Sequence, residues 1–66
     1  MRRILRLTDT GRFIKAPGED TTYFHEGQPF SGFSEAWTFC SERGLEGTEL
    51  VLIDESGEEQ LCIRIN

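Results

Sequence analysis

The sequence has few of the residues from which catalytic and metal-binding sites are built. It contains one histidine, His25, and two cysteines, Cys40 and Cys62, which stand far apart. Neither C-x-x-C nor H-x-x-x-H spacing occurs, and the glycines form no dinucleotide-binding or phosphate-binding loop. A G-x-S-x-G nucleophile motif is also missing. We therefore expect no enzymatic activity, no bound metal and no cofactor.

Long apolar runs are missing as well. After Arg2 and Arg3, the apolar pair Ile4-Leu5 is followed by Arg6, so this segment is too short for the apolar part of a signal peptide. No stretch approaches the ~20 apolar residues of a membrane span. Two cysteines are too few for the multi-disulfide framework of a small secreted domain. We predict a cytoplasmic protein without membrane contact, in which both thiols are reduced.

The chain is too short for more than one hydrophobic core. Its 66 residues predict a single domain, 1–66. A domain of this size buries only about 60% of the surface that its unfolded chain exposes, and its net stability is expected to be about 3–5 kcal/mol. The apolar residues nevertheless fall in periodic runs, which indicates a folded chain.

The first third predicts three short strands. Residues 3–7, 12–16 and 21–24 are rich in apolar and β-branched side chains. They are separated by Asp9-Thr10-Gly11 and by Pro17 to Asp20, which are typical of turns. A three-stranded antiparallel meander follows from this spacing.

The middle of the chain predicts one amphipathic helix from Gly32 to Arg43. Ser31 is the expected N-cap, and Gly44 is the expected residue after the last turn, followed by an apolar contact from Leu45. The expected buried stripe has the spacing i, i+3, i+4 and i+7 and consists of Phe33, Ala36, Trp37 and Cys40. Phe39 falls on the flank of this stripe, so we expect it to be partly exposed.

The last third predicts a β-hairpin. Residues 50–53 are continuously apolar, the turn Asp54 to Gly57 follows, and Leu61, Ile63 and Ile65 then alternate with Cys62 and Arg64. The predicted fold is α+β: a small two-layer domain in the order β-β-β-α-β-β, with one amphipathic helix packed on a mainly antiparallel sheet. In this arrangement Cys62 lies on the sheet face opposite Leu61 and Ile63.

Charge is distributed unevenly along the chain. Residues 1–15 hold five basic groups and one acid, whereas residues 16–66 hold two basic groups and eleven acids, and the net charge is −5. Proteins that bind nucleic acid directly need the opposite sign, so direct nucleic-acid binding is not expected. The simplest interpretation of the acids is a solubilising surface, which is ordinary near hairpin turns.

A functional interpretation is that the acids imitate a nucleic-acid backbone and dock on a protein with a basic surface. In size and charge, though in no sequence motif, such a chain would match phage-encoded inhibitors such as anti-CRISPR proteins and other DNA mimics. The hypothesis is a small, acidic, non-catalytic binding protein that inhibits a basic nucleic-acid-binding protein by occlusion. The predicted contact residues are Glu35, Phe39, Glu42, Glu46, Glu49, Asp54, Glu55, Glu58 and Glu59, with Phe39 as the apolar anchor.

The alternative is an accessory protein-interaction or self-associating domain of a bacterial cytoplasm. Here the sheet edge or the arginine-rich first strand provides the contact, and the acids serve only solubility. Either hypothesis is compatible with a monomer or a weak dimer.

Overall fold

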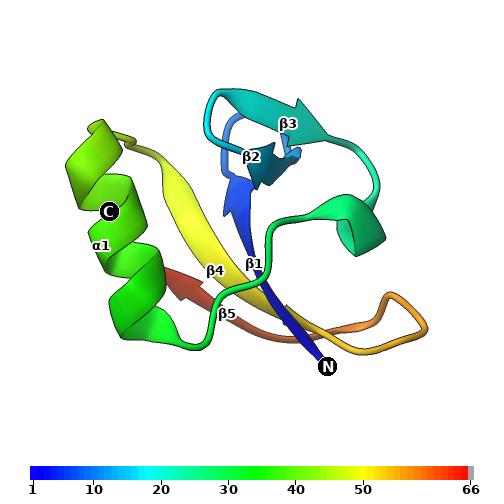
Figure 1. Ribbon diagram of the computed structural model, residues 1–66. Helices are drawn as coiled ribbons and strands as arrows, with labels where there is room; N and C mark the ends of the chain where they lie inside the picture. The colour runs from blue at the N-terminus through cyan, green and yellow to red at the C-terminus, as the bar shows by residue number, and fades with distance from the viewer. Residues whose placement is uncertain (66) are drawn as a thin grey trace.

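The computed structural model describes residues 1–65, and residue 66 of the predicted domain lies outside the described residues. The elements in chain order are β1 (Arg2–Leu7), β2 (Phe13–Ala16), β3 (Glu19–Thr21), the 3-10 helix η1 (Phe24–Glu26), α1 (Phe33–Arg43), β4 (Thr48–Ile53) and β5 (Glu59–Arg64) (Figure 1). The predicted α+β fold with one helix on an antiparallel sheet is confirmed.

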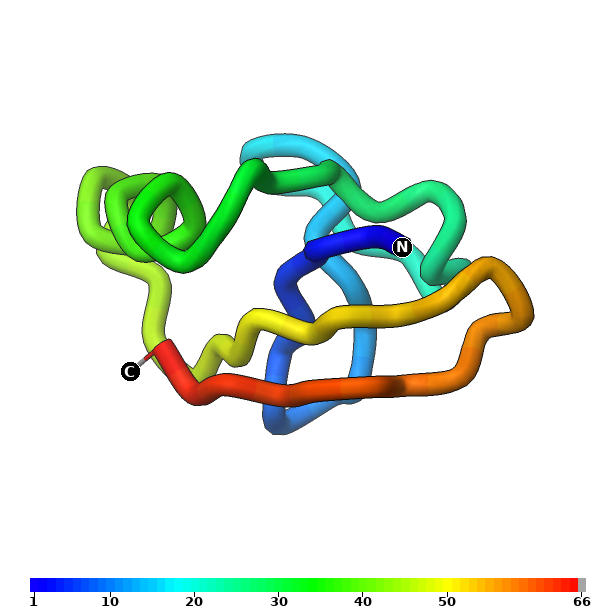
Figure 2. The backbone as a smooth tube through the Cα atoms, turned by 90° about the horizontal axis from the view of Figure 1, so that it is seen from below, coloured from blue at the N-terminus to red at the C-terminus, as the bar shows by residue number. Residues whose placement is uncertain are grey.

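The five strands form one antiparallel sheet in the order β3-β2-β1-β4-β5. The first strand of the chain is therefore the central one, and it pairs along its whole length with β4, with Leu5 opposite Leu50. β5 pairs with β4 on the other side and forms one edge of the sheet. Figure 2 shows α1 almost end-on, lying to one side of the β4–β5 hairpin.

Both faces of the central strands are covered. Leu5 and Leu50 belong to a buried cluster under α1, whereas Ile4 and Val51 belong to a second cluster next to Phe24 of η1. Because successive residues of a strand point to opposite faces, α1 covers one face of the sheet and the segment around η1 covers the other. The predicted free thiols also lie on different faces of the sheet: Cys40 of α1 is buried between the helix and one face, and Cys62 is exposed on the opposite face.

The predicted position of the third strand is wrong. The expected strand was 21–24, but β3 is Glu19–Thr21 and Phe24 already belongs to η1. The turn at Gly18, with φ of 79°, reverses the chain so tightly that Glu19 pairs directly with Ala16. The Thr21 hydroxyl then accepts the Tyr23 N–H at 3.1 Å, which turns the backbone out of the ladder.

The ends of α1 agree only partly with the prediction. Gly44 is in the left-handed conformation and donates its N–H to Cys40 and Ser41, so the predicted helix end is confirmed. The predicted N-cap is wrong, because the cap position is taken by Gly32, which has no side chain to accept a hydrogen bond. The Ser31 hydroxyl instead donates to the Glu35 carboxylate at 3.0 Å, one turn into the helix.

The predicted buried face of α1 is also wrong. Ala36 and Cys40 are fully buried as expected, but Phe39 replaces Trp37 in the core: Phe39 is 7% exposed and Trp37 is 51% exposed. The reason is Phe30, which is buried in the connector before α1 and packs edge-to-face against Phe39, with 5.2 Å between the ring centroids. The helix is thus turned about its axis toward this connector.

Candidate functional site

The predicted acidic residues do not form one surface. Glu35 and Glu42 lie on α1 and Glu46 follows it, whereas Asp54, Glu55, Glu58 and Glu59 lie in or next to the β4–β5 turn. In both Figure 1 and Figure 2 this turn and α1 are at opposite ends of the molecule. The predicted acids therefore form two separate groups, one at α1 and one at the β4–β5 turn.

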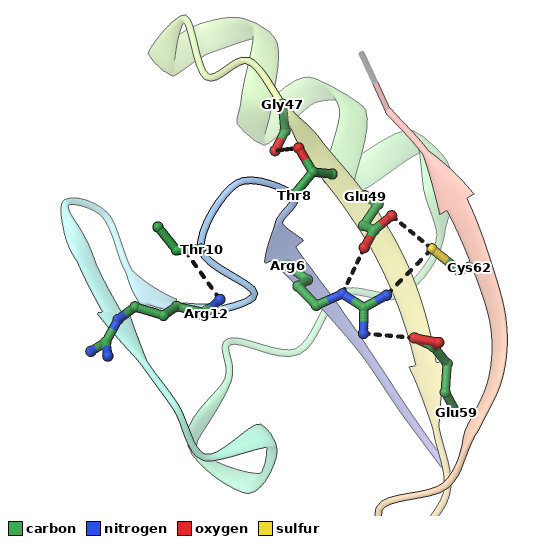
Figure 3. A network of polar contacts seen from close by, with 8 residues as sticks. All are labelled: Arg6, Thr8, Thr10, Arg12, Gly47, Glu49, Glu59 and Cys62. Carbon is green, nitrogen blue, oxygen red and sulfur yellow. Dashed lines mark hydrogen bonds and ion pairs between the residues drawn. The ribbon is translucent and has the colours of Figure 1, made fainter.

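Two of the predicted contact acids form ion pairs with Arg6 on the surface of the sheet (Figure 3). Arg6 of β1 donates its Nε–H to Glu49 of β4 at 2.6 Å, and its Nη1 lies 2.7 Å from the carboxylate of Glu59 of β5. The Cys62 thiol donates to the other oxygen of Glu49 at 3.0 Å. This network connects β1, β4 and β5 on the face opposite α1. Glu49 and Glu59 therefore stabilise the sheet.

The network also affects the reactivity of the Cys62 thiol. Partial desolvation of the thiol, and then the carboxylate of Glu49, raise the pKa of Cys62, while the hydrogen bond from Cys62, and then Arg6, lower the pKa of Glu49. A thiol with a raised pKa holds little thiolate at neutral pH and is a weak nucleophile. The hydrogen bond between Cys62 and Glu49 is therefore a structural one.

Asp54 acts as the organising residue of the β4–β5 turn. Its Oδ1 accepts the N–H of Ser56 at 2.9 Å and that of Glu58 at 3.0 Å, and its Oδ2 accepts from Gln60 at 2.9 Å. The Ser56 hydroxyl, followed by the Glu58 N–H, lowers the pKa of Asp54. Of the predicted acids at the turn, Glu55 and Glu58 remain as exposed side chains on an ordered loop.

Phe39 cannot act as the exposed anchor that the sequence predicts. Its ring is buried against Phe30 and is covered on the outside by Arg43, whose guanidinium carbon lies 4.0 Å from the ring centroid. Arg43 also donates to the Phe39 carbonyl at 3.3 Å. The aromatic side chains that do reach solvent on α1 are Phe33 and Trp37.

These two aromatics are part of an apolar surface, which we call the α1–β5 face. Phe33 is 44% exposed, Leu61 is 52% exposed and Ile63 is 38% exposed. A groove of about 130 Å³ runs between them and is lined by Arg3, Phe33, Leu50, Leu52, Leu61 and Ile63. Trp37 stands one helical turn after Phe33, on the same side of the helix. The α1–β5 face is defined as Phe33, Trp37, Leu52, Leu61 and Ile63, with Arg3 at its rim.

Two larger hollows lie beside α1. One of about 540 Å³ lies beside the polar side of α1 and is bordered by Glu35, Glu42 and Arg43. Another of about 390 Å³ lies between the β2–β3 turn and the end of α1, with Leu45 on its floor. Within residues 1–65 no group of three or more side chains is arranged to hold a metal ion, and His25 is exposed on η1.

Sequence reasoning missed the α1–β5 face because it assigned Phe33 and Trp37 to the core. The signal that could have revealed it is the width of the apolar arc, since Phe33, Ala36, Trp37, Phe39 and Cys40 are more apolar residues than one narrow stripe holds. One side of such a wide arc must remain uncovered in a domain with a single helix.

No protein-family model, curated protein or solved structure matches the chain. None of the helices in residues 1–65 has the length and apolar character needed to cross a membrane.

Proposed function

We propose that this chain is a non-catalytic protein-binding domain and that its contact surface is the α1–β5 face. The observation that supports this proposal is the joint exposure of Phe33, Leu61 and Ile63 along one groove, with the exposed Trp37 one helical turn after Phe33. Contiguous apolar surface of this kind is uncommon on small monomeric domains and marks interaction sites.

The composition of the face supports the same proposal. Tryptophan, phenylalanine and arginine are enriched in the centres of protein interfaces, and the α1–β5 face combines Trp37 and Phe33 with Arg3 at its rim. The acids lie elsewhere, so a partner can approach the face without crossing a carboxylate cluster. This corresponds to the alternative hypothesis from the sequence, an interaction domain.

The test compares the proteins that the immobilised chain retains from an extract of its own cells. Trp37→Ser and Leu61→Thr each remove an apolar side chain of the face, and both side chains are exposed, so the fold should persist. The matched control is Tyr23→Ser, because Tyr23 is an equally exposed aromatic outside the face. We expect the two face variants to lose bound protein that wild type and the control retain. Unchanged retention by folded face variants would contradict the proposal.

A second candidate function is the inhibition of a basic, nucleic-acid-binding partner, of the anti-CRISPR or DNA-mimic type, through the β4–β5 turn. The observation in its favour is that Asp54 orders the turn that carries Glu55 and Glu58. Replacing both glutamates with lysine should weaken such binding by repulsion and reverse its salt dependence. If the double lysine variant loses the retained proteins while Trp37→Ser keeps them, this second function takes the place of the first.

A further inference from the structure

The two edges of the sheet are built differently. β3, at one edge, has only three residues, carries Glu19 and Asp20, follows a Pro-Gly turn and has a register irregularity opposite β2. Short length, charge, proline and bulges are the features by which proteins protect a sheet edge from pairing with another chain. The β3 edge is therefore protected from pairing with a strand of another chain.

β5, at the other edge, lacks these features along its middle. It has six residues, all exposed, and contains no proline. Its register irregularity lies at the Glu59 end, and the ladder is regular from Leu61 to Arg64. Its charges are one acid and one base, so the strand is neutral although the chain carries −5. Electrostatic repulsion between two copies is thus lower at this edge than at β3, which carries two acids and no base.

The hydrogen-bond alternation of β5 shows which backbone groups face outward. The Ile65 N–H donates to the Thr48 carbonyl at 3.0 Å. Because hydrogen-bonded and non-hydrogen-bonded pairs alternate along an antiparallel ladder, Ile63 and Leu61 also direct their backbone groups toward β4. Cys62, which lies between them, directs its N–H and C=O to the open edge.

We propose that β5 pairs with β5 of a second copy of this chain, antiparallel, about a two-fold axis at Cys62. The inference rests on the proposed function, because the second copy would occupy the edge of the α1–β5 face. In this register Cys62 is opposite the second copy's Cys62, and the two chains exchange the N–H···O bonds of this residue. Leu61 falls opposite the second copy's Ile63, which joins the two α1–β5 faces into one apolar surface.

The polar side chains of β5 fit the same register. Arg64 falls opposite the second copy's Gln60, so no two like charges face each other across the seam. A shift of the register by one residue would invert one copy relative to the other, so that Leu61 of one copy would lie beside the polar face of the second copy, which carries Arg6 and Glu49. Because the side chains of β5 complement those of a second β5 strand in this register, a second copy fits the edge better than an unrelated strand would.

The experiment measures the mass of the protein by sedimentation equilibrium over a wide concentration range. Wild type should form a dimer. Cys62→Pro removes an N–H that faces the open edge, a position at which an edge strand tolerates proline, and should raise the dissociation constant at least about tenfold. Cys62→Ser is the matched control and should still form the dimer. Leu61→Lys places two ammonium groups near the seam on an exposed position and should give a monomer whether or not Cys62→Pro folds.

A cross-linking experiment tests the register of the two β5 strands separately. In the proposed dimer a short bismaleimide, applied at alkaline pH because the pKa of Cys62 is raised, should cross-link wild type through Cys62, since opposite Cα atoms in such a pair are about 5.5 Å apart. Cys40 is buried, so Cys62→Ser should give no cross-link. A dimer that does not cross-link through Cys62, or one that Leu61→Lys does not dissociate, would overturn the inference.

The failure of this inference differs from the failure of the proposed function. A chain that stays monomeric at all concentrations, while Trp37→Ser still loses retained protein, refutes the second copy and leaves the α1–β5 face as a binding surface for another protein. A β5-linked dimer in which Trp37→Ser changes no retention refutes the proposed function alone.

Discussion

Because α1 buries Phe39 and exposes Trp37, the variants Phe39→Leu and Trp37→Leu should differ in stability. Leucine at position 39 keeps most of the apolar volume but loses the edge-to-face contact with Phe30 and the stacking of Arg43. These contacts contribute about 0.5–1.5 and about 0.5–1 kcal/mol in other proteins. We therefore expect Phe39→Leu to lower the free energy of unfolding by about 1–2 kcal/mol. Trp37→Leu changes an exposed side chain and should stay within about 0.5 kcal/mol.

Alanine is less suitable at position 39, because truncation of a buried phenylalanine costs about 3–5 kcal/mol. That is the whole stability expected of a domain of this size. The assay is urea denaturation followed by far-UV circular dichroism, since Trp37→Leu removes the only tryptophan. With a slope of about 1 kcal/mol per molar urea, Phe39→Leu should lower the midpoint by about 1–2 M.

The measurement is made at low protein concentration, because a dimer would stabilise the folded chain by mass action. If Trp37→Leu lowers the midpoint more than Phe39→Leu does, the helix buries the stripe that the sequence predicts. The α1–β5 face would then lose its two aromatic members.

Three further outcomes are expected. Gly27→Ala should lower the free energy of unfolding by about 1–3 kcal/mol in urea denaturation, because the added Cβ would lie 3.0 Å from Ile4 in the second cluster. Glu49→Gln should make Cys62 react faster with iodoacetamide near neutral pH, because this carboxylate helps to raise the thiol pKa; an unchanged rate would show that burial alone sets it. Asp54→Asn should lower the urea midpoint at neutral pH but not in strong acid: the folded pKa of Asp54 lies below its unfolded value, so its contribution is present above the unfolded pKa and is lost as the pH falls through the folded one. A difference between wild type and Asp54→Asn that persists in acid would argue against the carboxylate as the cause.

The sequence predicted the elements better than their faces. The Gly44 helix end and the β4–β5 hairpin follow from local rules, since glycine alone adopts the left-handed conformation easily and alternating apolar residues favour strands. The position of β3 depended on whether Gly18 reverses the chain in a tight turn, which the run of turn-forming residues did not specify. Strand order was not encoded in any local pattern.

The face of α1 was not predictable from its own residues. The stripes centred on Trp37 and on Phe39 both satisfy helical periodicity, and the choice between them is made by Phe30, which lies outside the helix. The same holds for the acids. Counting carboxylates identified the acidic residues, but only the three-dimensional pairing shows that Arg6 engages Glu49 and Glu59.

The central position of β1 has a consequence for how the chain is made. β1 leaves the ribosome before its partner β4 exists, so Ile4 and Leu5 stay exposed until most of the chain has been synthesised. Pairing across such a long separation slows folding compared with a helical protein of the same length. Arg2, Arg3 and Arg6 flank this apolar pair, and charges in that position act as gatekeepers against aggregation of a nascent strand. The three arginines thus place positive charge on both sides of the apolar pair during the interval before β4 has been made.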